Sequence, residues 1–145
     1  MPVSSNSGRQ QNADEQKSNA PPVTGFHVLI VDKDYDLGQS IKVALEALGF
    51  EVSIALDGNA ALAITELRSP DLLILDLQIP KRSGLLVMEY LAVNLENPIP
   101  SIVITANEGS RHKQYSELLG AVDYIIKPFT MERLISSVNN VLKKD

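Results

Sequence analysis

The stretch "HVLIVDKDYD", residues 27–36, runs from five mostly apolar residues directly into Asp32, Lys33 and Asp34. An apolar run that ends abruptly in carboxylates is typical of a buried strand that delivers acidic groups to a site. The ammonium group of Lys33 between two carboxylates is unusual in such a place. Three different chemistries would explain it, and each gives these three residues different roles.

Four more short apolar segments follow along the chain, separated by longer amphipathic segments. The predicted strands are 26–32, 51–56, 71–77, 100–106 and 122–126. The first predicted helix covers 37–48 and ends at Gly49, and the second runs from the N-cap Asp57 through Leu67. The third and fourth cover 84–95 and 111–119. The last helix is marked by the apolar residues Leu134, Val138, Val141 and Leu142. Five strand–helix units with near-continuous apolar strands predict an α/β fold. It consists of one doubly wound, five-stranded parallel sheet with five helices on its two faces.

Composition narrows the classes of function. The 145 residues carry a net charge of −5 and no cysteine. No basic stripe is available to neutralise phosphates, so nucleic acid is not expected as the main partner, and disulfide or thiolate chemistry is excluded. The N-terminus lacks the apolar core of a signal peptide, and the longest apolar runs reach about half a membrane span or less. These features predict a soluble, cytoplasmic protein without a membrane segment.

The first 24 residues differ from the rest of the chain. They are rich in Ser, Asn, Gln and Pro and contain no aromatic residue. A segment with so little apolar area cannot offset the entropy lost on ordering. Residues 1–24 are therefore predicted to be a disordered polar tail, and residues 25–145 the folded domain.

Polar side chains stand at four of the predicted strand ends. They are Asp32, Asp76, Thr105 and Lys127. The carboxyl ends of parallel strands meet at one edge of the sheet, which is where such folds place their active sites. Two carboxylates, a hydroxyl and an ammonium group are therefore expected to converge on a functional site. His27, near a strand start, and His112, in a polar helix, are expected to be structural and solvated, respectively.

Four segments, "LIVDKD", "LLILDLQIPKRSG", "IVITA" and "GAVDYIIKPF", together resemble the receiver domain of two-component response regulators. The resemblance covers residues 26–145 and suggests the stand-alone, chemotaxis-type form with a flavodoxin-like fold. It implies that Asp76 is the phosphoacceptor and that Thr105 and Lys127 contact the phosphoryl group. It also implies that Tyr124 is an aromatic switch and that the peptide bond between Lys127 and Pro128 is cis.

The resemblance also implies a magnesium site, formed by Asp32, Asp76 and the backbone carbonyl of Gln78. In the family, the residue after the first aspartate is normally a second acid that binds Mg²⁺ directly, and here it is Lys33. The usual three carboxylates and one lysine sum to −2, whereas two carboxylates and two lysines sum to zero. A monovalent cation ~5 Å from Mg²⁺ costs roughly 6 to 7 kcal/mol at an effective dielectric constant of 20. Lys33 can swing toward solvent and reduce that cost, but weak Mg²⁺ binding is expected.

Two versions of the receiver interpretation follow from Lys33. In the favoured one, Asp34 or the remaining ligands keep a weakened metal site and Asp76 is still phosphorylated. In the other, the Lys33 ammonium replaces the metal, and the domain is a pseudo-receiver that binds partners without phosphorylation. Intact Asp76, Thr105 and Lys127 favour phosphorylation, because a domain that never carries a phosphoryl group has no evident need for all three.

A third interpretation treats the opening segment as the nucleophile motif of haloacid-dehalogenase-type phosphatases, which it also resembles. Asp32 would attack phosphate, Asp34 would be the general acid, and Lys33 would be the variable residue between them. The sequence offers no downstream acidic pair at a strand end to hold the metal. This interpretation also leaves Asp76 and the "KPF" segment unexplained.

The receiver resemblance implies further partners and properties. The phosphodonor would be a histidine kinase or a histidine phosphotransfer protein, and the domain would not be an enzyme beyond catalysing its own phosphorylation and dephosphorylation. A downstream protein target would bind the surface of the helix at 111–119, the strand at 122–126 and the last helix. Gln78 and Asn107 would flank the attacking water, and two neutral amides predict slow autodephosphorylation. Apart from the resemblance, Lys81 and Arg82 follow Asp76 in the loop close to the expected site. They would either steer an anionic donor toward it or only keep the surface soluble.

Overall fold

The computed structural model describes residues 23–96, 98–106 and 109–142. It contains one sheet of five parallel strands in the order β2-β1-β3-β4-β5. The strands are β1 (His27–Val31), β2 (Glu51–Ala55), β3 (Leu72–Leu75), β4 (Ser101–Thr105) and β5 (Ala121–Ile126). The helices are α2 (Tyr35–Ala47), α3 (Gly58–Leu67), α4 (Gly84–Asn94), α5 (Ser110–Leu118) and α6 (Met131–Val141). The predicted α/β fold with a doubly wound parallel sheet and five helices is confirmed, and the predicted element boundaries lie close to the observed ones.

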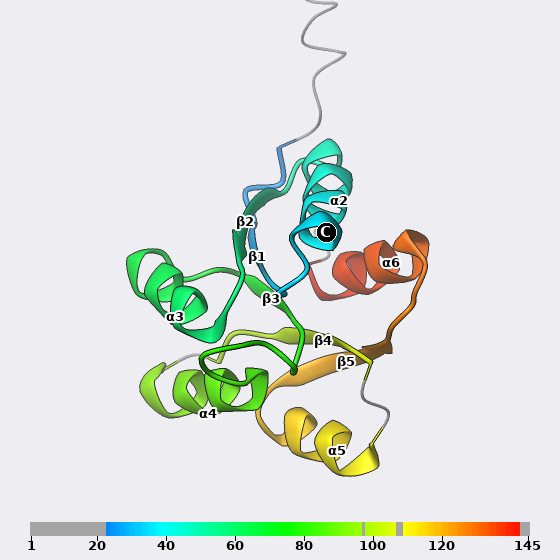
Figure 1. Cartoon of the computed structure of the whole chain (residues 1–145). Helices are drawn as coiled ribbons and strands as arrows, with labels where there is room; N and C mark the ends of the chain where they lie inside the picture. The colour runs from blue at the N-terminus through cyan, green and yellow to red at the C-terminus, as the bar shows by residue number, and fades with distance from the viewer. Residues whose placement is uncertain (1–22, 97, 107–108, 143–145) are drawn as a thin grey trace, which may run out of the picture.

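The helices form two layers around the sheet. Figure 1 shows α2 and α6 on one face and α3, α4 and α5 on the other. Along β1, Val28 and Ile30 pack in the core under α2 and α6, while Leu29 and Val31 pack in the core under α3 and α4. Because both faces are covered, each strand is apolar at successive positions rather than at alternating ones. This explains why the strands read as continuous apolar runs in the sequence.

Short polar side chains fix where four of the helices begin. Asp34, Asp57, Ser83 and Thr130 are the N-caps of α2, α3, α4 and α6, and each side-chain oxygen accepts a hydrogen bond from a backbone N–H in the first turn. Such caps satisfy backbone donors that have no partner inside the helix. Gly49 follows α2 with φ of 95°, a left-handed conformation that glycine adopts at little cost. The predicted cap at Asp57 and the predicted stop at Gly49 are both present.

The folded domain begins close to residue 24. The backbone N–H and the hydroxyl of Thr24 both donate to the carbonyl oxygen of Gly49, each at 3.1 Å. The predicted disordered tail falls almost entirely on residues 1–22, which lie outside the described residues. The division of the chain into a tail and a domain therefore stays a prediction.

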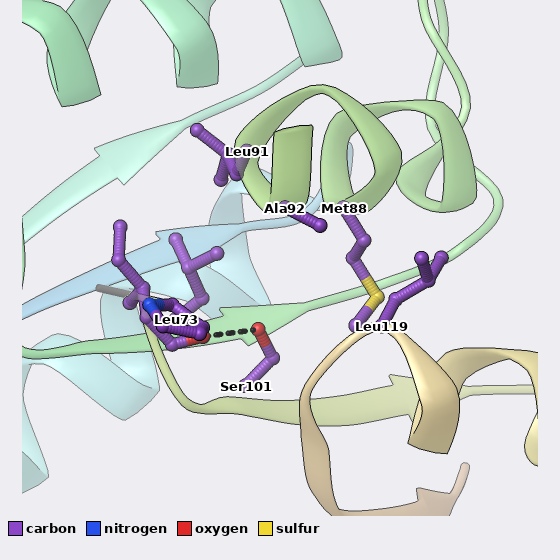
Figure 2. A pocket seen from close by; sticks show the side chains of 8 residues that line it. Leu73, Met88, Leu91, Ala92, Ser101 and Leu119 are labelled. Atoms are coloured by element: carbon purple, nitrogen blue, oxygen red, sulfur yellow. Dashed lines mark hydrogen bonds between the residues drawn. The ribbon is translucent and has the colours of Figure 1, made fainter. Parts of the chain in front are cut away.

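A small cavity lies near the amino ends of the strands, on the side away from the strand ends that carry Asp32 and Asp76. Figure 2 shows its lining, which includes Leu73, Met88 and Leu119, with a hydrogen bond from Ser101 to the carbonyl oxygen of Ile99 beside it. Its volume is about 10 Å³. A space of that size holds about one water molecule at most, so it is a packing defect rather than a ligand site.

His27 is buried at the start of β1, as expected for a structural histidine. Its Nε2 lies 2.8 Å from the Ser53 hydroxyl, while its buried Nδ1 has no hydrogen-bond partner among the residues that the structure describes. Burial lowers the pKa of His27, and the Arg68 charge lowers it further, against the opposing charges of Glu51 and Asp71. The folded protein therefore favours the neutral imidazole.

We expect His27 to make the fold sensitive to mild acid. Below pH ~6.5 the unfolded chain binds a proton at His27 that the folded chain resists, so stability falls as pH decreases until the lowered pKa is reached. This loss is at most about 1.4 kcal/mol for each pH unit within that window. Urea unfolding between pH 7.5 and 5.5 should show a smaller loss in His27→Gln than in the unaltered protein. Parallel curves would contradict this role of His27.

Candidate functional site

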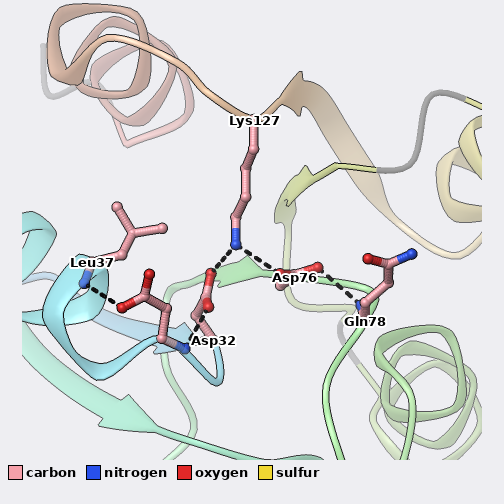
Figure 3. Close-up of polar contacts among 6 residues, drawn as sticks. Asp32, Leu37, Asp76, Gln78 and Lys127 are labelled. Carbon is pink, nitrogen blue, oxygen red and sulfur yellow. Dashed lines mark hydrogen bonds and ion pairs between the residues drawn. The ribbon is translucent and has the colours of Figure 1, made fainter.

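Three charged side chains from three strand ends meet at the carboxyl edge of the sheet. Val31 pairs with Leu75 in the β1–β3 register, so the next residues of the two strands, Asp32 and Asp76, become neighbours. Figure 3 shows Lys127 reaching between them. Its Nζ atom lies 2.7 Å from Oδ2 of Asp32 and 2.7 Å from Oδ2 of Asp76. The structure thus brings together three of the four predicted strand-end groups in one hydrogen-bonded cluster.

The second oxygen of each carboxylate is held by its own loop. Oδ1 of Asp32 accepts a hydrogen bond from the N–H of Asp34 at 2.8 Å, and Oδ1 of Asp76 accepts one from the N–H of Gln78 at 2.9 Å (Figure 3). In both loops the donor is two residues after the aspartate, which is the geometry of an Asx turn. The two carboxylates are therefore fixed by their local sequence as well as by Lys127.

The cluster is largely removed from water. Asp32 is 0% exposed and Asp76 is 4% exposed, while 22% of the Lys127 side chain is exposed. Burial opposes the charge on Lys127, but hydrogen bonds and charge interactions with both aspartates outweigh it and raise the pKa of Lys127 above its ordinary value. Lys127 is accordingly a fixed cation at neutral pH. The three groups together carry a net charge of −1.

Lys33 and Asp34 do not join this cluster. Both residues are exposed, and Lys33 has no ion pair within 4 Å among the residues that the structure describes. Oδ1 of Asp34 accepts a hydrogen bond from the N–H of Leu37 at 3.1 Å and caps α2. This contact gives Asp34 a structural role, so the structure offers no support for Asp34 as a substitute metal ligand or as a general acid.

The remaining donors suit a weak magnesium site. Within 23–96, 98–106 and 109–142, no three His, Cys, Asp or Glu side chains gather in a group that could hold a metal ion. A metal site formed by Asp32, Asp76 and the Gln78 carbonyl would offer two carboxylates and one backbone oxygen as ligands. Mg²⁺ is commonly bound in proteins through one or two carboxylates, with water and phosphate oxygens completing its shell. The chemistry of the donor set therefore fits Mg²⁺, with one carboxylate fewer than in the usual receiver site.

Thr105 and Tyr124 lie on neighbouring strands beside the cluster. Thr105 is fully buried at the end of β4, and its carbonyl oxygen accepts a hydrogen bond from the N–H of Lys127 at 2.8 Å. Tyr124 pairs with Val103, two residues before Thr105, so the Tyr124 and Thr105 side chains share one face of the sheet. Burial and, to a lesser extent, the charge of Asp76 raise the pKa of Tyr124. Tyr124 is thus within electrostatic reach of Asp76.

The loop after β5 shapes the space next to Lys127. The peptide bond between Lys127 and Pro128 is cis, as predicted. An open cavity of about 370 Å³ lies beside it, lined by Leu37, Lys127, Pro128 and Phe129. No sequence pattern pointed to Leu37 or Phe129 as neighbours of the site, and only the folded chain places them next to Lys127.

The remaining predicted residues occupy the rim or fall outside the structure. The side chain of Gln78 is exposed, and Asn107 lies outside the described residues. Slow autodephosphorylation set by these two amides therefore stays a prediction, which decay rates of Gln78→Ala and Asn107→Ala would test. Lys81 and Arg82 are exposed in the loop after β3, and Nζ of Lys81 lies 3.8 Å from Oδ2 of Asp57. His112, expected on a solvated face, is half-buried and lines a cavity with Leu85, Arg111 and Tyr115.

Comparisons with known proteins agree with this geometry. The family model for the response regulator receiver domain matches residues 28–139. The chain is 37% identical over 118 residues to "Probable transcriptional regulator ycf27" of Cyanidium caldarium, covering 81% of this chain and 47% of that protein. It is also similar to the solved Francisella response regulator 1452 receiver domain, at 30% identity and a TM-score of 0.75, covering 81% of this chain and 97% of that one. The chemotaxis response regulator CheY4 of Vibrio cholerae is 27% identical, with a TM-score of 0.74 and coverage of 80% and 98%.

The chain spans about half the length of the curated relatives that it matches. The prediction of a stand-alone receiver therefore stays a prediction. The phosphatase interpretation is not supported, because Asp34 caps α2 and the family model covers Asp76 and the "KPF" segment together. Receiver domains are phosphoacceptor modules rather than true enzymes, and they generally bind Mg²⁺ and interact with histidine kinases. The chain belongs to the response regulator receiver domain family and acts in phosphorelay signal transduction.

Proposed function

We propose that Asp76 is the phosphoacceptor of this receiver and that Asp32, Lys127 and Thr105 assist it. The observation that carries the proposal is the Nζ atom of Lys127, which lies 2.7 Å from a carboxylate oxygen of both Asp32 and Asp76. A phosphoryl group that approaches Asp76 brings negative charge toward a carboxylate, so a fixed cation at that point lowers the electrostatic barrier. Lys127 is held there by two carboxylates before any phosphodonor arrives.

The reaction is a transfer between two nucleophiles. An oxygen of Asp76 forms a bond to phosphorus while the bond from phosphorus to the donor nitrogen of a phosphohistidine breaks, and the electron pair of that bond leaves with the imidazole. Lys127 would balance charge on the phosphoryl oxygens, and the hydroxyl of Thr105, the last residue of β4, would donate to one of them. Mg²⁺ bound by Asp32, Asp76 and the Gln78 carbonyl would supply further positive charge.

The proposed donor is a histidine kinase or a histidine phosphotransfer protein, and the proposed output surface is formed by α5, β5 and α6. On this surface Asp123 accepts two hydrogen bonds from Arg133, at 2.8 and 2.9 Å, and one from Ser137 at 2.7 Å. The pKa of Asp123 is lowered to about 2, and the hydrogen bond from Arg133 is the main cause. These charges are thus already paired within the domain. Leu118 and Val122, which are 83% and 55% exposed, remain as apolar contact points for a protein target.

Among the described residues, no helix combines the length and the apolar character needed to cross a lipid bilayer. A cytoplasmic location and the absence of nucleic acid as a partner of this domain stay predictions.

Incubation with acetyl phosphate and Mg²⁺ should add one phosphoryl group to the protein, as measured by intact mass. The acceptor is an aspartate, so the added mass should be lost on treatment with hydroxylamine. Asp76→Asn should abolish the gain, because the amide cannot form an acyl phosphate under these conditions. A gain that survives Asp76→Asn would contradict the assignment, and no gain at high Mg²⁺ would favour the pseudo-receiver alternative. That alternative has one supporting observation, which is the capping role of Asp34 beside the substituted Lys33.

Phosphorylation is also expected to move Tyr124. A phosphoryl group on Asp76 would draw the Thr105 hydroxyl toward it and vacate space that Tyr124 can enter on the same face of the sheet. The coupling passes through one pair of side chains, so we expect a population shift of about 1 to 3 kcal/mol. NMR signals of the Tyr124 ring should change on phosphorylation and should change less in Thr105→Val. Unchanged Tyr124 signals would contradict the switch assignment.

A further inference from the structure

The loop from Asp76 to Gly84 is in close backbone contact with its surroundings at two glycines. A Cβ atom at Gly84 would lie 2.6 Å from the carbonyl oxygen of Asp76 and 2.6 Å from Cα of Leu77. The N–H of Gly84 also donates to the carbonyl oxygen of Leu77 at 3.0 Å. This contact closes the loop onto the start of α4. The second contact joins the loop to a different helix.

That second contact is at Gly58, the first residue of α3. A Cβ atom there would lie 2.2 Å from the carbonyl oxygen and 2.9 Å from the carbonyl carbon of Arg82. These neighbours are backbone atoms that a side-chain rotation cannot remove. In addition, the N–H of Gly58 donates to the carbonyl oxygen of Pro80 at 3.2 Å. The loop after β3 therefore rests directly on the amino end of α3.

Side chains reinforce this backbone contact. Oδ1 of Asp57 accepts the hydrogen bond from the N–H of Ala60 at 2.7 Å that caps α3, while its Oδ2 lies 3.8 Å from Nζ of Lys81. Nε of Arg82 donates to Oδ1 of Asn59 at 3.4 Å. Lys81 has a φ of 69°, in the left-handed region that few residues other than glycine adopt. The loop keeps this conformation while it is joined to α3 on both sides of Lys81.

We propose that Asp57 and Gly58 are positioning residues for the phosphoacceptor loop. They fix the backbone from Pro80 to Arg82 and, through it, the segment at Gln78, whose N–H holds Oδ1 of Asp76. The inference rests on the proposed function of Asp76 and adds α3 to the elements that set the geometry of the site. Among the described residues, neither Asp57 nor Gly58 forms a hydrogen bond or an ion pair with Asp32, Asp76 or Lys127.

Two glycine substitutions give a matched comparison. Gly58→Ala forces the Arg82 backbone to move, whereas Gly38→Ala places a Cβ in ordinary contact with the Ile54 side chain, at 3.5 Å or more. Both glycines are buried in helices. Gly58→Ala should slow phosphorylation by acetyl phosphate at least tenfold and weaken Mg²⁺ binding severalfold, while Gly38→Ala should stay within twofold of the unaltered protein. Circular dichroism at the assay temperature tests whether each variant is folded.

Two further variants separate positioning from simple destabilisation. Lys81→Gly added to Gly58→Ala relieves the left-handed conformation and lets the loop move, so it should restore most of the Mg²⁺ affinity. Asp57→Asn keeps a side-chain oxygen that can cap α3 but removes the charge that faces Lys81, and it should weaken Mg²⁺ binding about twofold. If Gly58→Ala does not fold, Asp57→Asn decides the matter. Unchanged affinity in that variant would overturn the inference.

The hydrogen-exchange rate of the Gln78 N–H tests the positioning role of Gly58 independently of whether Asp76 is phosphorylated. Exchange should be at least tenfold faster in Gly58→Ala than in Gly38→Ala, whether or not either protein accepts a phosphoryl group. If the unaltered protein is never phosphorylated but the Gln78 exchange rate rises as expected, the proposed function fails and the positioning role stands. If phosphorylation occurs but exchange, rate and Mg²⁺ affinity in a folded Gly58→Ala match those of Gly38→Ala, the positioning role is wrong.

Discussion

Lys127→Met should remove phosphorylation by acetyl phosphate almost completely and should also reverse the pH dependence of stability in mild acid. The ammonium group lies 2.7 Å from each of two aspartates that are 0% and 4% exposed. Removing one partner from a buried ion pair costs about 3 to 5 kcal/mol, because it leaves charge buried without compensation. We expect a loss at the lower end of this range at pH 7, since backbone N–H groups still hold Asp32 and Asp76.

The direction in which the stability of Lys127→Met changes with pH shows whether its loss of stability comes from uncompensated charge or from a packing defect. In the unaltered protein the raised pKa of Lys127 keeps its contribution present from neutral pH up to about 10.5, and the contribution is lost as the pH rises above that value. In Lys127→Met, two uncompensated neighbouring carboxylates should take up a proton more readily in the folded state than in the unfolded one. Its stability should therefore rise between pH 7 and 5, measured by urea unfolding at each pH.

Lys127→Arg is the control, because it keeps a positive charge at the same position. It should lose less stability than Lys127→Met and should show no rise in stability on acidification. If Lys127→Met were as stable as the unaltered protein at pH 7, the ion pairs would contribute nothing to the fold. If it were phosphorylated at the normal rate, the charge-balancing role of Lys127 would be wrong.

Lys33→Asp should strengthen Mg²⁺ binding by roughly 10- to 100-fold. The substitution removes the positive charge next to Asp32 in the sequence and adds a carboxylate where the family normally has one. Lys33 is exposed and has no ion pair within 4 Å among the described residues, so solvent screens much of the roughly 6 to 7 kcal/mol estimated for close approach. A residual effect of about 1.4 to 2.8 kcal/mol corresponds to the expected range in affinity.

Titration with Mg²⁺, followed through the backbone N–H signals of Asp34 and Gln78, measures this affinity directly. Lys42→Glu makes the same change in charge within α2 and should leave the affinity within about twofold, because Lys42 lies two turns from the site. The rate of phosphorylation at low Mg²⁺ should rise in Lys33→Asp in parallel with the affinity. Equal affinity in the unaltered protein and in Lys33→Asp would show that the lysine points away from the metal.

The sequence alone determined the fold and most of the cluster. Apolar residues at successive strand positions require a sheet covered on both faces, and parallel strands bring their carboxyl ends to one edge. For this reason Asp32, Asp76 and Lys127 were predicted to meet although 95 residues separate the first from the last, and the structure places them within hydrogen-bond distance. The N-cap at Asp57 was also predictable, because capping depends on neighbouring residues only.

Only the tertiary structure decided how the side chains around the cluster are used. Asp34 was open to two roles in the sequence, metal ligand and general acid. The structure instead places it at the start of α2, because its oxygen meets the N–H of Leu37 rather than the carboxylate cluster. Gly58 carried no signal beyond its place after an N-cap. Its role comes from the Arg82 backbone, which lies against it from a loop more than 20 residues away. Strand patterns depend on periodic burial that a sequence displays, whereas such contacts depend on the path of two loops that only the packed helices and sheet define.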